Sequence, residues 1–511
     1  MPGTTVLLSL DGIGITEKTA YNAFIEAKTP NIDRLIYEYP AVRGLSAGMA
    51  VGLPNGQSGN SKAGYENIGA GRIVYQQLTR INKEISSGVF FENDVLLDTI
   101  AYCRRNDSSL HIIGMLSDGG IHSHTEHIYA LLKLAADNSF NNVYVHCITD
   151  GRDNGLGIRH MERLQTKMRE LGVGEVATVS GRFYAMDRDN NYDRIKLVYL
   201  AMTQGEGEKA ANAVEAVQAA YDNGDTDEFI KPTVIVNGGV PVGAINDSDA
   251  VIFCNIRSDR SRELTRAFCE DEFRMFKRDY RPDIRFLCFD DPDPSIENKL
   301  VVFPNQPVEN TLGEYLSLLG LRQLRLTESE NHSNVNVFFD CGSHEALDGV
   351  DRLSVRSAKV KEPGAIKADM SADAICDKLI DAMKDNRYDF IVCSMANADV
   401  LGHTCNMDAA VRAMEKLDTC VGRIVDTAIV NNCVLFICST HGKIEQLIDY
   451  ESGEPYKCHT SNPVPFILVN HYEDVKLREA GCLADVAPTL LEIMGIQQPK
   501  EMTGKSLINR Q

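Results

Sequence analysis

The feature that most constrains the fold of this 511-residue chain is a pattern of short apolar runs that each end in polar residues. Each run has the length and composition of a strand buried on both faces. Stretches with helical periodicity alternate with the runs, as at 408–430 and 483–494. This alternation predicts an α/β fold with mostly parallel sheets. The clearest apolar runs are 6–10, 111–116, 143–148, 390–395 and 434–438.

The residues directly after these runs are the first candidates for function. In an open α/β sheet, ligands bind beyond the carboxyl ends of the strands. Asp11, Asp118, Arg152, Asp399 and His441 all follow a predicted strand. One such aspartate alone is as readily explained as a helix N-cap. Several strand ends that share acids and imidazoles are poorly explained in that way, so we expect a site at this edge.

The distribution of these residues predicts a discontinuous domain, although no repeat or Pro/Gly-rich linker marks its borders. Metal-binding residue types lie near both ends of the chain, whereas arginine-rich motifs lie in the middle. We therefore expect residues 1–75 and 306–511 to form one domain, and residues 76–305 to form a second domain inserted into it.

Charge and cysteine content exclude several classes of protein. The 52 Lys+Arg and 72 Asp+Glu residues leave a net charge of −20, which argues against coating of nucleic acid or of an anionic membrane. No apolar stretch approaches the roughly 20 residues that span a bilayer, and the N-terminus lacks the basic region of a signal peptide. The 14 cysteines contain no C-x-x-C pair, which favours reduced thiols in a cytoplasmic protein.

A set of acids and imidazoles points to a metal. Asp399 and His403 share one face if their segment is helical, and His441, His459 and Asp11 lie at other predicted strand ends. Carboxylate and imidazole together suit a divalent ion such as Mn²⁺ or Zn²⁺. A lone Asp-x-x-x-His is usually a solvated helix face, but the whole set favours metal binding.

Ser61 is the candidate nucleophile. It lies in the small-residue loop 56–64, which would let a phosphate approach backbone N–H groups. Taken alone, this loop is as well explained as an ordinary glycine-rich turn. A serine needs a base or a metal to become a nucleophile, and the acid–imidazole set could supply one.

A group of arginines in the middle of the chain suits an anionic substrate. Guanidinium groups bind carboxylate and phosphate through two parallel hydrogen bonds. Each of these arginines has an aspartate nearby, so surface ion pairs are the alternative. Together with His122 they fit a small acid that bears both groups. The arginines are Arg152, Arg182, Arg188, Arg257 and Arg260.

These residues stand in longer motifs that resemble the cofactor-independent (2,3-bisphosphoglycerate-independent) phosphoglycerate mutases of the alkaline phosphatase superfamily. The resemblance covers essentially the whole chain, from Asp11 to Leu507. It implies an alkaline-phosphatase-like αβα sandwich with an inserted α/β domain. The motifs are Gly-Gln-x-Gly-Asn-Ser ending at Ser61, 67–72, 117–124, 150–153, 180–189 and 462–465.

The resemblance implies an isomerase of glycolysis and gluconeogenesis that interconverts 3- and 2-phosphoglycerate through a phosphoserine at Ser61. Residues 1–75 and 306–511 would be the metal-binding, phosphatase-like domain, and 76–305 the phosphotransferase domain. Closure of the domains would exclude water. The partner would be a small phosphoglycerate, with no nucleic acid or membrane, and the protein a cytoplasmic monomer.

Asp399, His403 and His459 would hold one divalent ion, Mn²⁺, and Asp11, Ser61 and His441 would contribute to a second. His122, Arg152, Asp153, Arg182, Arg188, Arg257 and Arg260 would hold the substrate.

The chain departs from the family pattern inside these motifs. Thr440 stands where an aspartate ligand of the second metal is expected, which removes a negative charge and should weaken that site. Asn331 replaces a lysine thought to act on the transferring phosphate. Lys62 and Tyr65 replace a Glu and a His after the nucleophile, and Ser258 is a mild change. Such losses could cost on the order of 10³ or more in rate.

These departures leave several hypotheses open. Lys62 and Lys443 are new cations near Ser61 and His441, and they either replace the second metal in part or reflect drift. The protein is then either a mutase, at full or reduced rate, or a catalytically weak or dead relative that acts as a ligand-binding or scaffold protein. A phosphatase or sulfatase on the same fold is a third hypothesis, against which the arginine-bearing insert argues.

Overall fold

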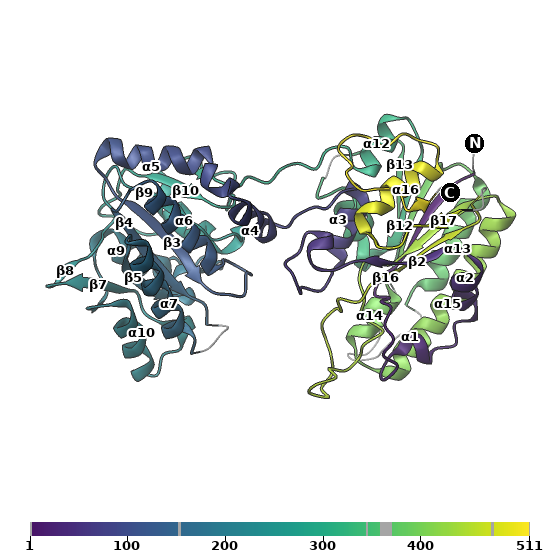
Figure 1. Ribbon diagram of the computed structural model, residues 1–511, viewed down its shortest axis with the longest axis horizontal. Coiled ribbons are helices and arrows are strands. Elements are labelled where there is room, and N and C mark those ends of the chain that lie inside the picture. The colour runs from purple at the N-terminus through teal and green to yellow at the C-terminus, as the bar shows by residue number, and fades with distance from the viewer. Residues whose placement is uncertain (1–2, 152–154, 344–345, 358–369, 472–474, 510–511) are drawn as a thin grey trace. The chain divides into compact units, whose positions relative to one another are not determined.

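The computed structural model describes residues 3–151, 155–343, 346–357, 370–471 and 475–509. Two compact units make up the chain (Figure 1). Unit 1 consists of Met1–Thr79 with Pro307–Gln511, so it is discontinuous in sequence. Unit 2 is the continuous segment Arg80–Gln306. Each unit has its own sheet and its own buried core.

Unit 1 is organised around an eight-stranded mixed sheet. Its first strand lies at the centre, between two strands from the far end of the chain, and both pairings are parallel: Thr5 lies opposite Phe390 on one side and Val434 on the other. Every residue of this first strand is buried, as its continuous apolar run predicts. In spatial order the strands are β13 (Val350–Val355), β12 (Gln323–Glu328), β14 (Phe390–Met395), β1 (Thr5–Leu10), β15 (Val434–Cys438), β16 (Val464–Val469), β2 (Ala41–Leu45) and β18 (Gly481–Cys482); β16 is antiparallel to both of its neighbours.

Helices cover both faces of this sheet (Figure 1). On one face, Met414, Leu417, Val421 and Ile424 of α15 repeat at helical spacing and pack into the core. The helices of this face are α1 (Ala23–Glu26), α2 (Pro30–Glu38), α13 (Ala372–Asp385) and α15 (Met407–Val430). The helices of the other face are α3 (Ser61–Ala70), α12 (Leu312–Leu318) and α16 (Val486–Ile493).

Unit 2 contains a second, largely parallel sheet. Along its order, β7 pairs antiparallel with β5. The strands in spatial order are β11 (Leu300–Val301), β10 (Arg285–Cys288), β9 (Ala250–Phe253), β3 (Leu110–Leu116), β4 (Val143–Thr149), β5 (Glu175–Gly181), β7 (Thr233–Asn237) and β6 (Glu208–Ala210), with β8 (Val240–Pro241) paired to β7. The helices are α4 (Gln77–Ser87), which begins in unit 1, α5 (Asp94–Asn106), α6 (Thr125–Asp137), α7 (Gly157–Leu171), α8 (Arg182–Ala185), α9 (Tyr192–Gln204), α10 (Ala213–Asp222) and α11 (Arg262–Cys269).

The predicted α/β class with mostly parallel sheets is confirmed. The five apolar runs correspond to β1, β3, β4, β14 and β15. The predicted helix at 408–430 is α15, and the one at 483–494 is a short 3₁₀ turn followed by α16. Within the described part of the chain, no helix combines the length and apolar character that a membrane crossing requires.

Candidate active site

Two neighbouring strands of unit 1 bring Asp11 and Asp399 together. Asp11 follows β1, and Asp399 lies in α14 (Asn397–His403), which follows β14. The Asp399 amide donates to the Asp11 carbonyl at 3.0 Å. Gly12 lies between them at φ +91°, and a Cβ there would come within 2.5 Å of Asp399 Cα. Only glycine permits this approach, so the backbone itself holds the two acidic positions side by side.

Asp399, His403 and His459 form one cluster, as the resemblance implies. Helix α14 places Asp399 and His403 on one face, which confirms the predicted helical spacing. Asp399 Oδ1 lies 3.3 Å from His403 Nε2 and 3.3 Å from His459 Nε2. The three ligand atoms lie within 4.8 Å of one another. Burial alone would raise the pKa of Asp399, but the two imidazoles beside it hold that pKa well below its usual range.

The hydrogen bonds behind these imidazoles aim them at the cluster. His403 Nδ1 lies 3.0 Å from the Lys457 carbonyl and His459 Nδ1 lies 2.9 Å from the Gly59 carbonyl. Each Nδ1 therefore donates to a carbonyl, which turns each Nε2 inward, and the two Nε2 atoms lie 2.9 Å from each other. Asp399 Oδ1 is buried without a hydrogen bond. This is the donor set and the outer support that a protein offers to a divalent cation.

Ser61 lies beside this cluster, in contact with His441. It is the first residue of α3, whose N-cap Asn60 accepts from the Ala63 amide at 2.9 Å. Ser61 Oγ is 3.1 Å from His441 Nε2, and the His441 ring stacks on His459 with centroids 3.9 Å apart. Burial lowers the pKa of His441 to about 3.

The Asp11 carboxylate accepts a complete set of hydrogen bonds. Its side chain is fully buried, and burial raises its pKa. Two donors reach Oδ1 and three reach Oδ2, and all five come from side chains of unit 1. The donors are Ser9 Oγ at 2.5 Å and Thr440 Oγ1 at 2.9 Å to Oδ1, and Tyr65 Oη at 2.8 Å, Ser394 Oγ at 3.2 Å and Asn334 Nδ2 at 3.4 Å to Oδ2.

Glu445 is a further site residue that sequence reasoning missed. This buried carboxylate accepts from the Gly14 amide at 3.0 Å, the Lys443 amide at 2.8 Å, the Asn462 side chain at 3.0 Å and the Thr460 hydroxyl. It thereby ties the loop after β1, the loop that carries His441 and the segment after His459 to one another. No motif around it singled it out. The sequence contained one indication of the hydrogen-bond donors around Asp11: two of them, Tyr65 and Thr440, depart from the family pattern.

The two new lysines point to other partners. The Lys443 ammonium is buried and donates to the carbonyls of Tyr456 at 2.9 Å and Gln446 at 3.4 Å. Lys62 pairs with Glu66 at 3.7 Å and is half exposed. Asn331 ends a 3₁₀ turn after β12. Each ammonium thus has partners other than Ser61 and His441.

Unit 2 gathers its predicted residues at the carboxyl ends of β3, β4, β5 and β9. Arg182, which follows β5, is buried and pairs with Asp150 at 3.0 Å and with Glu228 at 3.3 Å. Arg257 and Arg188 both contact Asp259, at 2.8 Å and 3.3 Å.

Positive charge accumulates at this edge of unit 2. Burial, together with the neighbouring Arg257, Arg182 and Arg260, lowers the pKa of His122 to about 4. Burial, Arg182 and Arg188 likewise lower the pKa of Arg260. The structure therefore brings His122 and these arginines into one electropositive group suited to an anion. The predicted ligands Arg152 and Asp153 lie outside the described residues.

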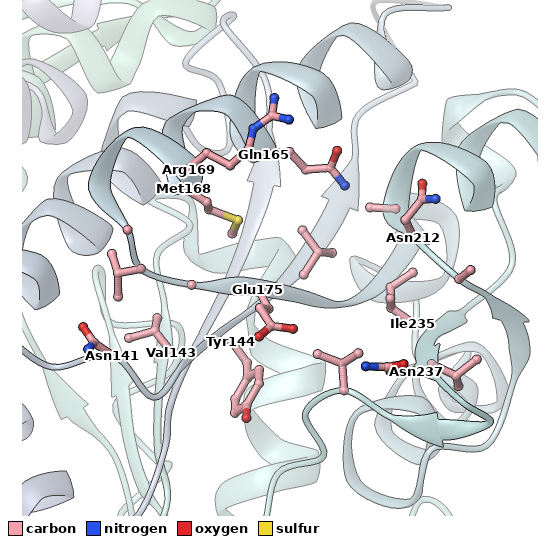
Figure 2. A pocket seen from close by; sticks show the side chains of 18 of the residues that line it. Asn141, Val143, Tyr144, Gln165, Met168, Arg169, Glu175, Asn212, Ile235 and Asn237 are labelled. Atoms are coloured by element: carbon pink, nitrogen blue, oxygen red, sulfur yellow. The ribbon is translucent and has the colours of Figure 1, made fainter.

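A hollow in unit 2 lies at the opposite ends of β4 and β5 from the arginine group. It measures about 720 Å³ and is lined by the starts of β4 and β5 and by the end of α7. Figure 2 shows Arg169, Gln165 and Met168 on one side of it and Tyr144 and Glu175 on the other. It is thus separate from the arginine group, which lies at the carboxyl ends of the same strands.

Fold and site together define a two-unit α/β protein with an acid–imidazole centre in one unit and a group of arginines in the other. Residues 81–292 match the family model "BPG-independent PGAM N-terminus". Two curated relatives, both called 2,3-bisphosphoglycerate-independent phosphoglycerate mutase, are similar over nearly the whole chain. That of Lachnoclostridium phytofermentans is 50% identical over 99% of this chain and 98% of its own, and that of Acetivibrio thermocellus is 48% identical over 98% of each. The chain belongs to the family of 2,3-bisphosphoglycerate-independent phosphoglycerate mutases.

A solved structure supports the same assignment. A phosphoglycerate mutase of Leishmania mexicana, determined at low cobalt concentration, is similar with a TM-score of 0.62 and 27% identity. The match covers 100% of this chain and 98% of that one. Both α/β units therefore belong to the shared fold.

Proposed function

We propose that the protein interconverts 3-phosphoglycerate and 2-phosphoglycerate through a phosphoserine at Ser61, as an isomerase of glycolysis and gluconeogenesis. The observation that carries this proposal is the position of Ser61. Its hydroxyl is at a helix N-terminus, 3.1 Å from His441 and beside the cluster of Asp399, His403 and His459. The identity of about half with named mutases over the full chain gives the reaction.

The helix that begins at Ser61 favours the phosphorylated state. Its first backbone N–H groups have no partner within the helix and point toward its N-terminal end. An anion at this end is stabilised by these groups and by the helix dipole. His441 Nε2 orients the Ser61 hydroxyl and is neutral at pH 7, because burial lowers its pKa to about 3.

The cluster of Asp399, His403 and His459 would hold a divalent ion, and we propose Mn²⁺. The fit rests on the inward Nε2 atoms and on the buried, unengaged Asp399 Oδ1. When bound, the ion would supply positive charge for the transferring phosphoryl group. Mixed carboxylate and imidazole donors are compatible with Mn²⁺.

The arginine group of unit 2 would hold the glycerate. Arg257, Arg260 and Arg188 would bring guanidinium groups to a carboxylate and a phosphate; Asp259 orients Arg257 and Arg188, and Asp150 and Glu228 orient Arg182. His122 is neutral at pH 7 and can exchange a hydrogen bond with a hydroxyl. By resemblance, Arg152 and Asp153 complete this set. We also propose that the protein acts in the cytoplasm as a monomer.

An enolase-coupled assay on the full chain with 3-phosphoglycerate tests this proposal. We expect turnover that requires Mn²⁺ and is lost with EDTA. Free phosphate should form far more slowly than 2-phosphoglycerate, because the group is transferred and not hydrolysed. Absence of turnover with Mn²⁺ bound would contradict the proposal, and phosphate release without 2-phosphoglycerate would indicate a phosphatase.

A further inference from the structure

Asp399 and Asp11 are neighbouring buried acids whose surroundings differ in one decisive respect. An ionised carboxylate offers about four lone-pair sites, which either accept hydrogen bonds or bind a cation. Around Asp399, Oδ1 is buried without a hydrogen-bond donor, and the Nε2 atoms of His403 and His459 each lie 3.3 Å from it and 2.9 Å from each other, close enough to share one cation. This acid is therefore open to a cation.

The surroundings of Asp11 are closed. A carboxylate has about four lone-pair sites, and Asp11 accepts hydrogen bonds from five donors. No oxygen lone pair therefore remains for a metal. The Tyr65 and Thr440 hydroxyls are both within 3.0 Å of it. Tyr65 and Thr440 are two of the positions at which the chain departs from the family motifs, and both departures converge on this one carboxylate.

Packing keeps these donors in place. Tyr65 lies one helical turn after Ser61 in α3 and is fully buried. Gly64 lies against Thr440, since a Cβ there would come within 2.5 Å of Thr440 Cβ. Helix α3 and the loop that carries His441 are thus pressed together next to Asp11. The hydroxyl donors belong to a close-packed core, in which each movement displaces neighbours.

The other candidate ligands on this side are also engaged. Ser61 Oγ and His441 Nε2 contact each other at 3.1 Å. Thr440 is neutral, so Asp11 is the sole formal negative charge among Asp11, Ser61, Thr440 and His441. These residues do not fit a second divalent ion.

We propose that this protein works with a single divalent cation, at Asp399, His403 and His459, and that Asp11 is a positioning residue held by hydroxyl donors. Through Tyr65 it fixes α3 and hence Ser61, and through Thr440 it fixes the neighbouring His441. This proposal deepens the proposed function, because it names how many cations the mutase site holds. Neither Lys62 nor Lys443 stands in for the missing ion.

The test is a count of Mn²⁺ per chain, independent of turnover. Full-length protein is stripped with EDTA, titrated with Mn²⁺, and analysed by equilibrium dialysis with metal analysis and by EPR, which separates isolated from coupled ions. The His403→Gln variant removes a ligand that is 40% exposed, so its folding should be preserved. Asp11→Asn keeps the size of the buried acid, and circular dichroism checks its fold.

We expect one isolated Mn²⁺ per chain in the unmodified protein, a loss of at least about tenfold in affinity in His403→Gln, and one ion still bound in Asp11→Asn. Two ions per chain, a coupled EPR signal, or an ion retained at full affinity by His403→Gln would overturn the proposal, as would binding of less than one ion. Should Asp11→Asn not fold, the metal counts of the unmodified protein and of His403→Gln still test the proposal.

Two ions with full turnover would refute only this inference. One ion without turnover would refute only the mutase activity.

Discussion

In each unit, the candidate functional side chains lie at the carboxyl ends of parallel strands of its own sheet. The residue types differ in charge between the two units. Unit 1 collects carboxylates and imidazoles after β1, β14 and β15, whereas unit 2 collects guanidinium groups after β5 and β9. The guanidinium groups carry permanent positive charge and are partnered by acids of their own unit. An imidazole, unlike a guanidinium group, carries no permanent charge, so an added cation in unit 1 would supply the fixed positive charge that attracts a phosphoryl group.

The difference separates two tasks that a phosphoryl-transfer enzyme must perform. In the proposed function, unit 2 would recognise the anion with its own side chains, whereas unit 1 would supply the nucleophile and the metal site. We therefore expect substitutions in unit 1 to change the chemical step and substitutions in unit 2 to change substrate binding.

The largest expected effect tests whether the chemistry belongs to unit 1. Ser61→Ala should reduce turnover by at least about 10⁴-fold, because no other hydroxyl takes the place of the nucleophile. Mn²⁺ binding should be retained. The enolase-coupled assay measures the loss, and Ser58→Ala in the same loop is the matched control, with a change of no more than about twofold. Turnover in Ser61→Ala comparable to that of the unmodified protein would exclude the phosphoserine route.

The next largest effect tests whether the arginines of unit 2 bind the substrate. Arg257→Lys keeps the positive charge but removes the two parallel N–H donors of the guanidinium group. We expect KM to rise about 30-fold, equivalent to roughly 2 kcal/mol of binding free energy, with little change in kcat. The control is Arg274→Lys, which alters an exposed pair with Glu272 and should leave KM unchanged. An unchanged KM in Arg257→Lys would show that its contact with Asp259 is a surface ion pair only.

A third prediction uses the acid sensitivity of unit 2. Burial lowers the pKa of His127 to about 3, against about 6.5 when unfolded. Because the unfolded state binds the proton more tightly, the neutral imidazole contributes stability that is complete above pH 6.5 and is lost as the pH falls toward 3.

Between pH 7 and pH 5 this one group should cost about 2 kcal/mol of unfolding free energy. His127→Gln can still donate to Asn82, the partner of His127 Nε2, and should remove that part of the pH dependence. Urea unfolding at the two pH values measures it, with the exposed His332→Gln of unit 1 as control. An identical pH dependence in His127→Gln and in the unmodified protein would contradict the prediction.

The smallest effect concerns Lys62, the cation that follows the nucleophile in sequence. Lys62 is half exposed and pairs with Glu66 one turn away, a geometry worth no more than about 0.5 kcal/mol. Lys62→Gln should therefore change stability by less than this and turnover by less than about twofold. Lys133→Gln, which breaks the similar pair with Asp137 in unit 2, is the control. A tenfold loss of turnover in Lys62→Gln alone would show that this ammonium takes part in the reaction.

Much of the fold could be predicted because buried parallel strands leave a direct record in the sequence. The run at 390–395 is uninterrupted, and the Asp399-x-x-x-His403 spacing indicated the helix that unites these side chains. The antiparallel pairings of β16 leave no such record, since its apolar run reads the same in either direction.

The surroundings of Asp11 could not be predicted for a different reason. Ser9, Tyr65 and Thr440 lie far apart in sequence, and a hydroxyl has no spacing rule that assigns it to a distant carboxylate. The direction of the Lys443 side chain likewise depends on the carbonyls that surround it. Residue type suggests which groups matter, but only the packed structure shows which of them contact one another.

The central position of β1 has a consequence for synthesis of the protein. This strand leaves the ribosome before both of its neighbours, which begin at Phe390 and Val434 and are translated some 385 and 429 residues after Thr5. At about 5–20 residues per second the strand waits roughly 20 to 80 s for its first neighbour. Unit 2 is continuous, so it can complete its own sheet during that interval. A nascent chain can therefore carry a finished insert while β1 still lacks both of its neighbours.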